Sequence, residues 1–291
     1  ADRVVAVSPA SDIPVTIEWM NQLGSPLRDA RITARLSGSA FDASRVNAFS
    51  GFYDSNTGTV TWDSRSQSDL SQVGVAESGQ ISFNVRGRAQ VVGSSVVQRP
   101  EVVLAFDIEA TGIDGTVYRA HDVIQRTLQF DSQPTLVLET VHASGAFPNT
   151  GPIPPVVGVP TTYTVRWRVT NTSNELEDAT VTTSLGSGVV WLGKTSPAFE
   201  GITYNENSNT VTWDVGQLTA GAGFSRDERI AEFQVQISPS SSQVGRPAAL
   251  TNDVQFRGSD TFTQSDIRSS KSGHTTRLEG DTITDNGTVQ P

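Results

Sequence analysis

Residues 188–195 match the phosphate-binding loop pattern G-x-x-x-x-G-K-S/T, with Lys194 at the lysine position. A working loop of this kind follows a buried strand, wraps backbone N–H groups around phosphate and opens a helix. Here the interior of the motif is bulky and apolar, and Ser196-Pro197 follows without a helical pattern. We therefore interpret the match as a coincidence and predict an ordinary strand that carries Trp191. A nucleotide enzyme would need Lys194 to face a pocket.

A second candidate for chemistry is the turn 54–58, where Asp54 and Asn56 bring side-chain oxygens into one loop. Oxygen atoms are the ligands that Ca²⁺ prefers. A similar loop at 205–209 holds one Glu and three Asn. Neither loop has the spaced carboxylates and the bidentate closing acid of a strong calcium site. We expect hairpin turns at both places, with calcium at Asp54 and Asn56 as the weaker alternative.

The other groups that could act as acids, bases or nucleophiles lie apart in the sequence. The three histidines lack the spacing of metal ligands, and we expect each at the surface or at a strand end: His121, His142 and His274. No serine lies in a G-x-S-x-G motif. The paired acids fall in polar stretches typical of solvated turns: Glu175 and Glu177, Asp227 and Glu228. The sequence thus predicts no catalytic residue, no resident cofactor and no enzymatic activity.

Tryptophan rings could stack on sugars, which would indicate a carbohydrate-binding module. Four of the rings are in phase with aliphatic neighbours and are expected to lie buried between sheets: Trp19, Trp62, Trp167 and Trp213. Trp191 has no counterpart in the first half of the chain and is the candidate for an exposed, ligand-binding ring. Asn171 and Asn286 begin glycosylation sequons, which matter only in a glycosylating host.

The elements that position these residues are short strands. Apolar residues alternate with Thr, Arg, Gln or Glu, which is the period of a half-buried strand. The clearest rows are 15–19, 32–36, 60–62, 81–85, 163–169, 211–213 and 233–237. Polar turn clusters separate the rows, and no stretch shows a sustained helical stripe. The sequence therefore predicts an all-β fold of immunoglobulin-like antiparallel sandwiches.

The chain also repeats its own order of parts. Residues 60–63, Val-Thr-Trp-Asp, return as residues 211–214, and the repeat extends upstream: 15–19 corresponds to 163–167, and 29–33 to 178–182. We predict two sandwiches in tandem, 1–132 and 133–280, followed by a polar tail, 281–291. Repetition of this kind favours a module whose purpose is reach, display or self-assembly, because a single chemical step seldom needs its scaffold copied.

The predicted second sandwich carries an insertion near 142–160 that is rich in Gly and Pro. Such a segment is typical of extended, polyproline-like chain on a domain surface. We also consider that residues 143–159 could add as a strand to the edge of a neighbouring copy.

Three segments of the second half resemble a known family: residues 170–172 (Thr-Asn-Thr), 179–182 (Ala-Thr-Val-Thr) and 213–221 (Trp-Asp-Val-Gly-Gln-Leu-Thr-Ala-Gly). They are similar to the domain of unknown function 11 repeat, an immunoglobulin-like module of large prokaryotic cell-surface proteins. Residues 258–263 likewise resemble surface proteins of ultra-small bacteria. The first half departs from the pattern, because Ser64-Arg65-Ser66 replaces the Gly-x-Leu step after Trp62-Asp63. The resemblance implies a fold and an exported location, and it implies no active site.

Composition excludes several partners. The formal charge of −10, without a cluster of Lys or Arg, offers no basic surface to nucleic acid or anionic lipid. The absence of cysteine excludes disulfides and thiolate metal sites. No run of about 18 apolar residues is present, so we expect no direct membrane insertion in this segment. The first residues also lack the pattern of a signal peptide.

These observations lead to two hypotheses. The first is a non-enzymatic structural module of an extracellular, cell-surface protein: a stalk, surface-layer or filament component that associates with itself or with other surface proteins. The second is an adhesin or carbohydrate-binding module that recognises glycans through turns at one end of a sandwich, assisted by calcium. An exposed aromatic cluster around Trp191 would favour the second hypothesis.

Overall fold

The structure is a computed structural model that describes residues 3–8 and 12–291. Its regular elements are β-strands and three short 3-10 helices, η1 (Ser68–Leu70), η2 (Ala198–Glu200) and η3 (Ser241–Gln243). The predicted all-β fold of immunoglobulin-like sandwiches is confirmed. Within the described residues, no helix is long and apolar enough to cross a membrane.

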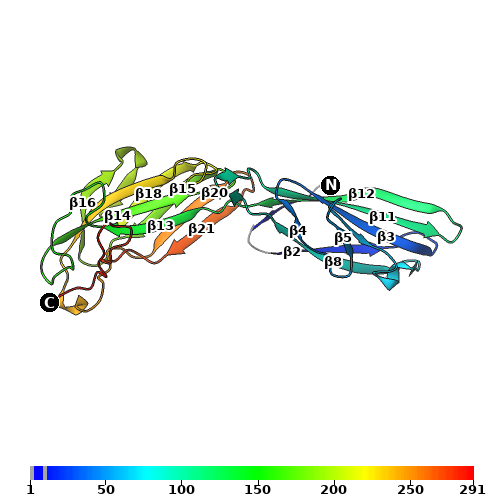
Figure 1. The fold of residues 1–291 in the computed structure, drawn as a ribbon, viewed down its shortest axis with the longest axis horizontal. Coiled ribbons are helices and arrows are strands. Elements are labelled where there is room, and N and C mark those ends of the chain that lie inside the picture. The colour runs from blue at the N-terminus through cyan, green and yellow to red at the C-terminus, as the bar shows by residue number, and fades with distance from the viewer. Residues whose placement is uncertain (1–2, 9–11) are drawn as a thin grey trace. The chain divides into compact units, whose positions relative to one another are not determined.

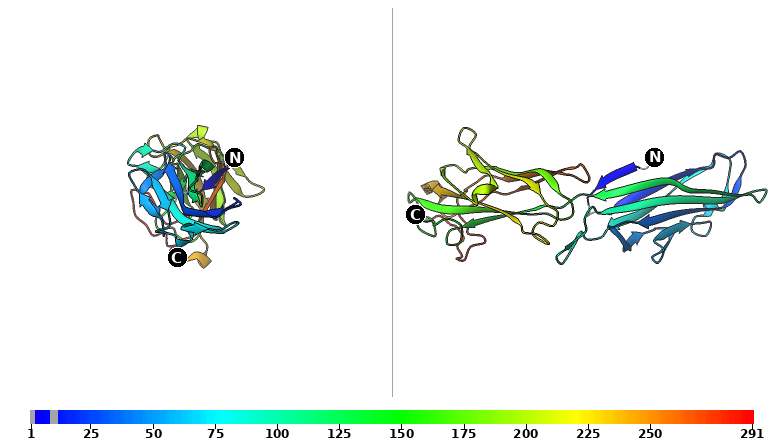
Figure 2. Two further views of the ribbon diagram at one scale, coloured as in Figure 1. Left: turned by 90° about the vertical axis from the view of Figure 1, so that its right-hand side faces the viewer. Right: turned by 90° about the horizontal axis from the view of Figure 1, so that it is seen from above.

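The chain divides into two compact units (Figure 1). Unit 1 comprises residues 1–92 and 97–131, and unit 2 comprises residues 93–96 and 132–291. Each unit has its own apolar core. Two facing sheets enclose that core in each unit (Figure 2).

Unit 1 pairs a large sheet with a sheet of three strands. The large sheet has the order β1 (Arg3–Val7), β12 (Val117–Phe130), β11 (Glu101–Gly112), β3 (Leu27–Ser37), β6 (Thr59–Trp62) and β5 (Phe52–Asp54), with β7 (Gln72–Val73) also on β3. The small sheet has the order β2 (Ile13–Met20), β8 (Ser78–Gly87) and β4 (Phe41–Asn47). A separate hairpin consists of β9 (Val91–Val92) and β10 (Ser95–Val96).

Unit 2 pairs a sheet of four strands with a sheet of five. The first has the order β13 (Thr135–Val141), β14 (Thr161–Thr170), β19 (Arg229–Ile237) and β16 (Val189–Ser196). The second has the order β17 (Ile202–Asn205), β18 (Thr210–Leu218), β15 (Leu176–Ser184), β20 (Val254–Asp260) and β21 (Asp266–Lys271).

The two units share their strand pairings. The pairs β2·β8 and β8·β4 of unit 1 recur as β14·β19 and β19·β16, and the order β5-β6-β3-β11-β12 recurs as β17-β18-β15-β20-β21. A bulge recurs as well: Asp29 and Asp178 both adopt a left-handed backbone, with φ of 51° and 50°. Asp tolerates that conformation better than most residues. The corresponding sequence segments therefore fold in corresponding ways.

Alternation along each strand builds the cores. Over most of β11 and β18 buried residues alternate with more exposed ones, as the period of a strand requires, with breaks at Ile108 and after Val215. Trp62 and Trp213 occupy equivalent positions, opposite Ile32 and Val181, and both are fully buried.

The first strand is where the units differ. In unit 2, β13 pairs antiparallel with β14 and so extends the four-stranded sheet. In unit 1, β1 pairs in parallel with β12, on the opposite sheet. The position beside β2 that corresponds to β13 is therefore empty in unit 1 among the described residues.

Residues 281–291, expected as a polar tail, pack on unit 2. Val289 is buried in the core, and Gln290 forms a bridge to Val156. The carboxylate of Asp281 accepts hydrogen bonds from the backbone N–H groups of residues 142–144. The Gly- and Pro-rich segment near 142–160 thus pairs with the end of its own unit.

Candidate functional site

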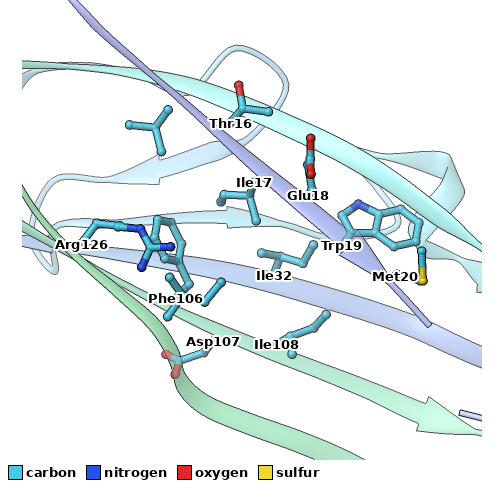
Figure 3. A pocket seen from close by; sticks show the side chains of 12 residues that line it. Thr16, Ile17, Glu18, Trp19, Met20, Ile32, Phe106, Asp107, Ile108 and Arg126 are labelled. Atoms are coloured by element: carbon cyan, nitrogen blue, oxygen red, sulfur yellow. The ribbon is translucent and has the colours of Figure 1, made fainter. Parts of the chain in front are cut away.

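An open groove runs along the free edge of β2 in unit 1. Its volume is about 510 Å³. The lining residues come from β2 on one side and from β3, β11 and β12 on the other: Val15, Thr16, Ile17, Glu18, Trp19 and Met20, then Ile32, Phe106, Asp107, Ile108, Ile124 and Arg126. Figure 3 shows Ile17 above Ile32, with Arg126 towards one end of the groove and Trp19 and Met20 towards the other. We call this feature the β2 groove.

The wall formed by β2 is amphipathic. Val15, Ile17 and Trp19 point inward and pack against the core, whereas Met20 is 57% exposed. Trp19 lies opposite Gly79 on β8, where a Cβ would be 2.5 Å from the indole ring. The indole packs over Gly79 because this residue has no side chain, yet Trp19 stays partly exposed. The expectation that all four repeated tryptophans are buried is therefore wrong for Trp19 and correct for the other three.

The floor of the β2 groove is apolar and unevenly covered. Ile32 and Phe106 are buried, whereas Ile124 on β12 is 42% exposed. Asp107 forms an ion pair with Arg35 at 2.6 Å. The Arg126 guanidinium donates to the carbonyl of Gln125. Exposed apolar surface between a few charged groups is typical of a surface that receives another apolar element.

The backbone of β2 is also available on its open side. In the described residues β2 pairs with β8 alone. Pro14 lies opposite Asn84, and a proline is tolerated inside a paired strand where its nitrogen faces the open edge. Thr16, Glu18 and Met20 are in phase with Pro14, so their N–H and C=O groups face the open edge too. The contact of 3.2 Å between Thr16 Oγ1 and Ser82 Oγ agrees with the close approach of a non-hydrogen-bonded pair.

In unit 2 the equivalent position is filled. Leu138 of β13 lies opposite Trp167, the counterpart of Trp19, and Trp167 is fully buried. The indole Nε1 of Trp167 donates to Nε2 of His274 at 2.9 Å, and Nδ1 of His274 lies 3.1 Å from Thr140 Oγ1 on β13. Because an indole N–H can only donate, Nε2 accepts and Nδ1 carries the proton.

His274 corrects a sequence expectation. It was expected at the surface or at a strand end, and instead it is 4% exposed. Burial lowers the pKa of His274 to about 3, so the imidazole is neutral at pH 7. His274 links the indole of Trp167 to Thr140 of β13 and so helps to bury the ring.

The calcium candidates form a hairpin turn. Asp54 Oδ1 accepts the N–H of Asn56 at 2.9 Å, and Asp54 Oδ2 accepts the hydroxyl of Thr57 at 3.0 Å. Both carboxylate oxygens are therefore engaged in the turn. Across residues 3–8 and 12–291, no group of three or more His, Cys, Asp or Glu side chains is placed to hold a metal ion.

Trp191 is half-buried and packs against the core of unit 2. Its ring stacks on Tyr204, with 5.3 Å between ring centroids, and is tilted against Phe233 at 5.2 Å. The ring is therefore less exposed than expected, and ligand binding by Trp191 stays a prediction. The phosphate-loop match lies on β16, as predicted, and Lys194 is exposed there. Asn171 is fully buried, so its sequon is inaccessible in the folded chain.

Comparisons with known proteins add only distant likenesses. No family model matches the chain. No curated protein matches it either. Among solved structures, BcpA, the major pilin subunit of Bacillus cereus, matches with 8% identity and a TM-score of 0.35, over 90% of this chain and 69% of that chain.

Two further solved structures are similar at the same level. The C-terminal domain of the Streptococcus pyogenes antigen I/II-family protein AspA has 10% identity and a TM-score of 0.31, over 92% of this chain and 94% of that chain. The full-length major pilin SpaD from Corynebacterium diphtheriae has 11% identity and a TM-score of 0.31, over 92% of this chain and 67% of that chain. These likenesses are too low to indicate a function.

Proposed function

We propose that this chain is a non-enzymatic structural module of a prokaryotic cell-surface protein, a component of a stalk, surface layer or filament. The observation that carries the proposal is the recurrence of the same strand pairings in both units. A copied scaffold adds length and contact surface to a protein, whereas a chemical step needs one site. The resemblance to the domain of unknown function 11 repeat supports the extracellular location.

A second candidate is an adhesin or carbohydrate-binding module. The partly exposed ring of Trp19, with Met20 beside it at the end of the β2 groove, is the observation that favours it (Figure 3). Sugars bind proteins through such exposed aromatic faces. The hairpin at Asp54 gives this candidate no support, because its oxygens are used within the turn.

Light scattering across a concentration series, with and without Ca²⁺, tests the proposal. We expect the mass to grow with protein concentration and not to depend on Ca²⁺, because contacts between copies would build the assembly. A constant monomer mass would contradict a filament or surface-layer subunit. The next experiment would then compare glycan binding by the parent chain with glycan binding by a Trp19→Ala variant.

A further inference from the structure

We infer that the β2 groove of unit 1 is a strand-acceptor site, and that β1 of a second copy of this chain fills it by pairing with β2. The inference rests on the proposed structural function and deepens it by naming the contact between copies.

The groove has the requirements of a missing strand. One wall offers the backbone groups of Thr16, Glu18 and Met20, which face an open edge. The floor offers apolar surface at Phe106, Ile108 and Ile124. Main-chain hydrogen bonds and pockets for alternate side chains are the two components of strand addition.

Unit 2 shows which occupant suits this position. There a single strand, β13, lies beside β14, and its residues Leu136 and Leu138 lie opposite Val169 and Trp167. The occupant is thus an extended segment with aliphatic side chains at alternate positions. A whole second sandwich would not fit, because β12 extends the large sheet beneath the open edge of β2 and lines the groove.

The strand β1 has the chemistry of that occupant. Its sequence is Arg-Val-Val-Ala-Val, and Val4 and Val5 are 55% and 36% exposed. It directly precedes β2, as β13 precedes β14, yet it lies on the opposite sheet in a parallel pairing. Parallel pairing is slightly less stable per residue than antiparallel pairing. By contrast, residues 155–157 already pair with the end of unit 2 and are not free to be donated.

The position of the groove favours a second copy over the same chain. If β1 folded back onto its own β2, the short connection 8–12 would place Val7 near Ile13. The five residues of β1 would then pair with β2 only as far as Ile17. The groove runs from Val15 to Met20. A strand from another molecule is not tethered at Ile13, and its five residues can pair with residues 15–19 of β2. Exchange of an identical element between copies is a common route to assembly.

Disulfide trapping tests the inference, and the chain has no cysteine of its own. A Val5→Cys protein is mixed with an Ile17→Cys protein and oxidised, so that the mixed disulfide can only join two molecules. Ile17 is at a non-hydrogen-bonded position of the open edge, where side chains of paired strands come closest. The control acceptor is Val190→Cys, which is 52% exposed on β16.

We expect about tenfold more mixed dimer with Ile17→Cys than with the Val190→Cys control. A tenfold preference corresponds to a difference of about 1.4 kcal/mol in binding free energy. Thr16→Pro removes an N–H from the open edge and should abolish this excess, whereas Thr16→Ala keeps the N–H and should preserve it. Near-ultraviolet circular dichroism confirms that both variants stay folded. An equal yield with both acceptors, or an intact excess with Thr16→Pro, would overturn the inference.

A double variant, Val5→Cys with Ile17→Cys, separates the two origins of the strand. Dimers and larger disulfide-linked species support exchange between copies, and an internal disulfide within the monomer overturns it. Large assemblies of the parent chain without any trapping would overturn strand donation and leave the proposed structural function standing. Trapped pairs that never grow beyond dimers would keep strand donation and contradict a filament.

Discussion

Unit 1 and unit 2 share their strand pairings and differ in how completely they are closed. Trp19 and Trp167 hold equivalent positions, but Trp167 is covered by β13 and His274, whereas Trp19 borders an open groove. The repeated rows of apolar residues are therefore sufficient to build the sandwich. Whether it closes is decided by flanking segments that are not repeated.

The second repeated tryptophan repeats this contrast. In unit 2 the indole N–H of Trp213 donates to Glu200, which is also paired with Arg229 at 2.6 Å. In unit 1 the indole N–H of Trp62 is buried, and it has no hydrogen-bond partner among the described residues. A buried donor without a partner costs about 1–3 kcal/mol. The buried indole N–H groups of Trp167 and Trp213 in unit 2 thus have polar partners, whereas that of Trp62 in unit 1 has none among the described residues.

The outer face of unit 2 adds a further difference. Arg166 bridges Glu139 and Glu232, and Arg168 bridges Glu139 and Glu228, so one ion-pair network joins β13, β14 and β19. Networks of charges stabilise a surface more than isolated pairs do. The network therefore holds β13 in its sheet. Unit 1 has no described strand at the position that corresponds to β13.

The largest expected effect comes from the tryptophans beside the first strand. Trp167→Ala should destabilise unit 2 by about 3–5 kcal/mol, because it empties a fully enclosed site. Trp19→Ala should cost unit 1 only about 1 kcal/mol, because the ring is already partly in water. Denaturant unfolding, with hydrogen exchange to assign the loss to a unit, measures both. Equal losses would remove the distinction between a closed unit and an open one.

Acid should destabilise unit 2 through His274. Its pKa is lowered to about 3 in the folded chain and lies near 6.5 when the chain unfolds. Below pH 6.5 His274 therefore binds a proton in the unfolded chain but not in the folded chain. The free energy of unfolding falls as the pH falls towards 3. At pH 4 the loss reaches about 3 kcal/mol.

Thermal unfolding of the full chain between pH 7 and pH 4 checks this expectation. A His274→Gln variant is less stable at pH 7 but should lose the part of the pH dependence that begins near 6.5. If that variant keeps the full dependence, other groups carry it.

Removing the partner of a buried indole should have an intermediate effect. Glu200→Ala leaves the N–H of Trp213 and the guanidinium of Arg229 without their acceptor, at a cost of about 2–3 kcal/mol to unit 2. Trp62→Phe in unit 1 loses ring volume but no hydrogen bond, and should cost about 1 kcal/mol. The urea midpoints of the two variants measure both losses of stability. A loss for Trp62→Phe as large as that for Glu200→Ala would contradict the difference between the two indole sites.

The smallest expected effect concerns the hairpin tips. Asp54→Ala should cost unit 1 about 0.5–1 kcal/mol through the lost turn hydrogen bonds. Asn205→Ala should cost unit 2 a similar amount, since Asn205 accepts the N–H of Asn207 in the equivalent turn. Millimolar Ca²⁺ should leave the melting temperature unchanged in both variants and in the parent chain. A rise in melting temperature with Ca²⁺ that disappears in Asp54→Ala would instead establish a calcium site.

Local alternation predicts most of the fold. The rows around Trp62, Trp167 and Trp213 form buried strands as expected, because burial there depends on the strand's own period. The turns at 54–58 and 205–209 also follow from local hydrogen bonds of Asp and Asn.

The candidate site was not predictable in this way, because it depends on pairing between distant segments. The alternation at Val15, Ile17 and Trp19 indicates an inward face but does not say whether another strand covers the edge. The apolar residues of β1 indicate a strand but not the sheet that it joins. His274 was misplaced for the same reason, since its partners Trp167 and Thr140 are 107 and 134 residues away in sequence.

The parallel pairing of β1 with β12 has a mechanical consequence. Both strands run the same way, with Val7 level with Phe130 where β12 ends. Tension between the chain before β1 and the chain after β12 would slide the two strands past each other and load all their hydrogen bonds at once, a geometry that resists rupture better than peeling bonds one by one. A β1 held by its own β12 carries tension along one chain. A β1 seated in a neighbour would pass that load to the next molecule.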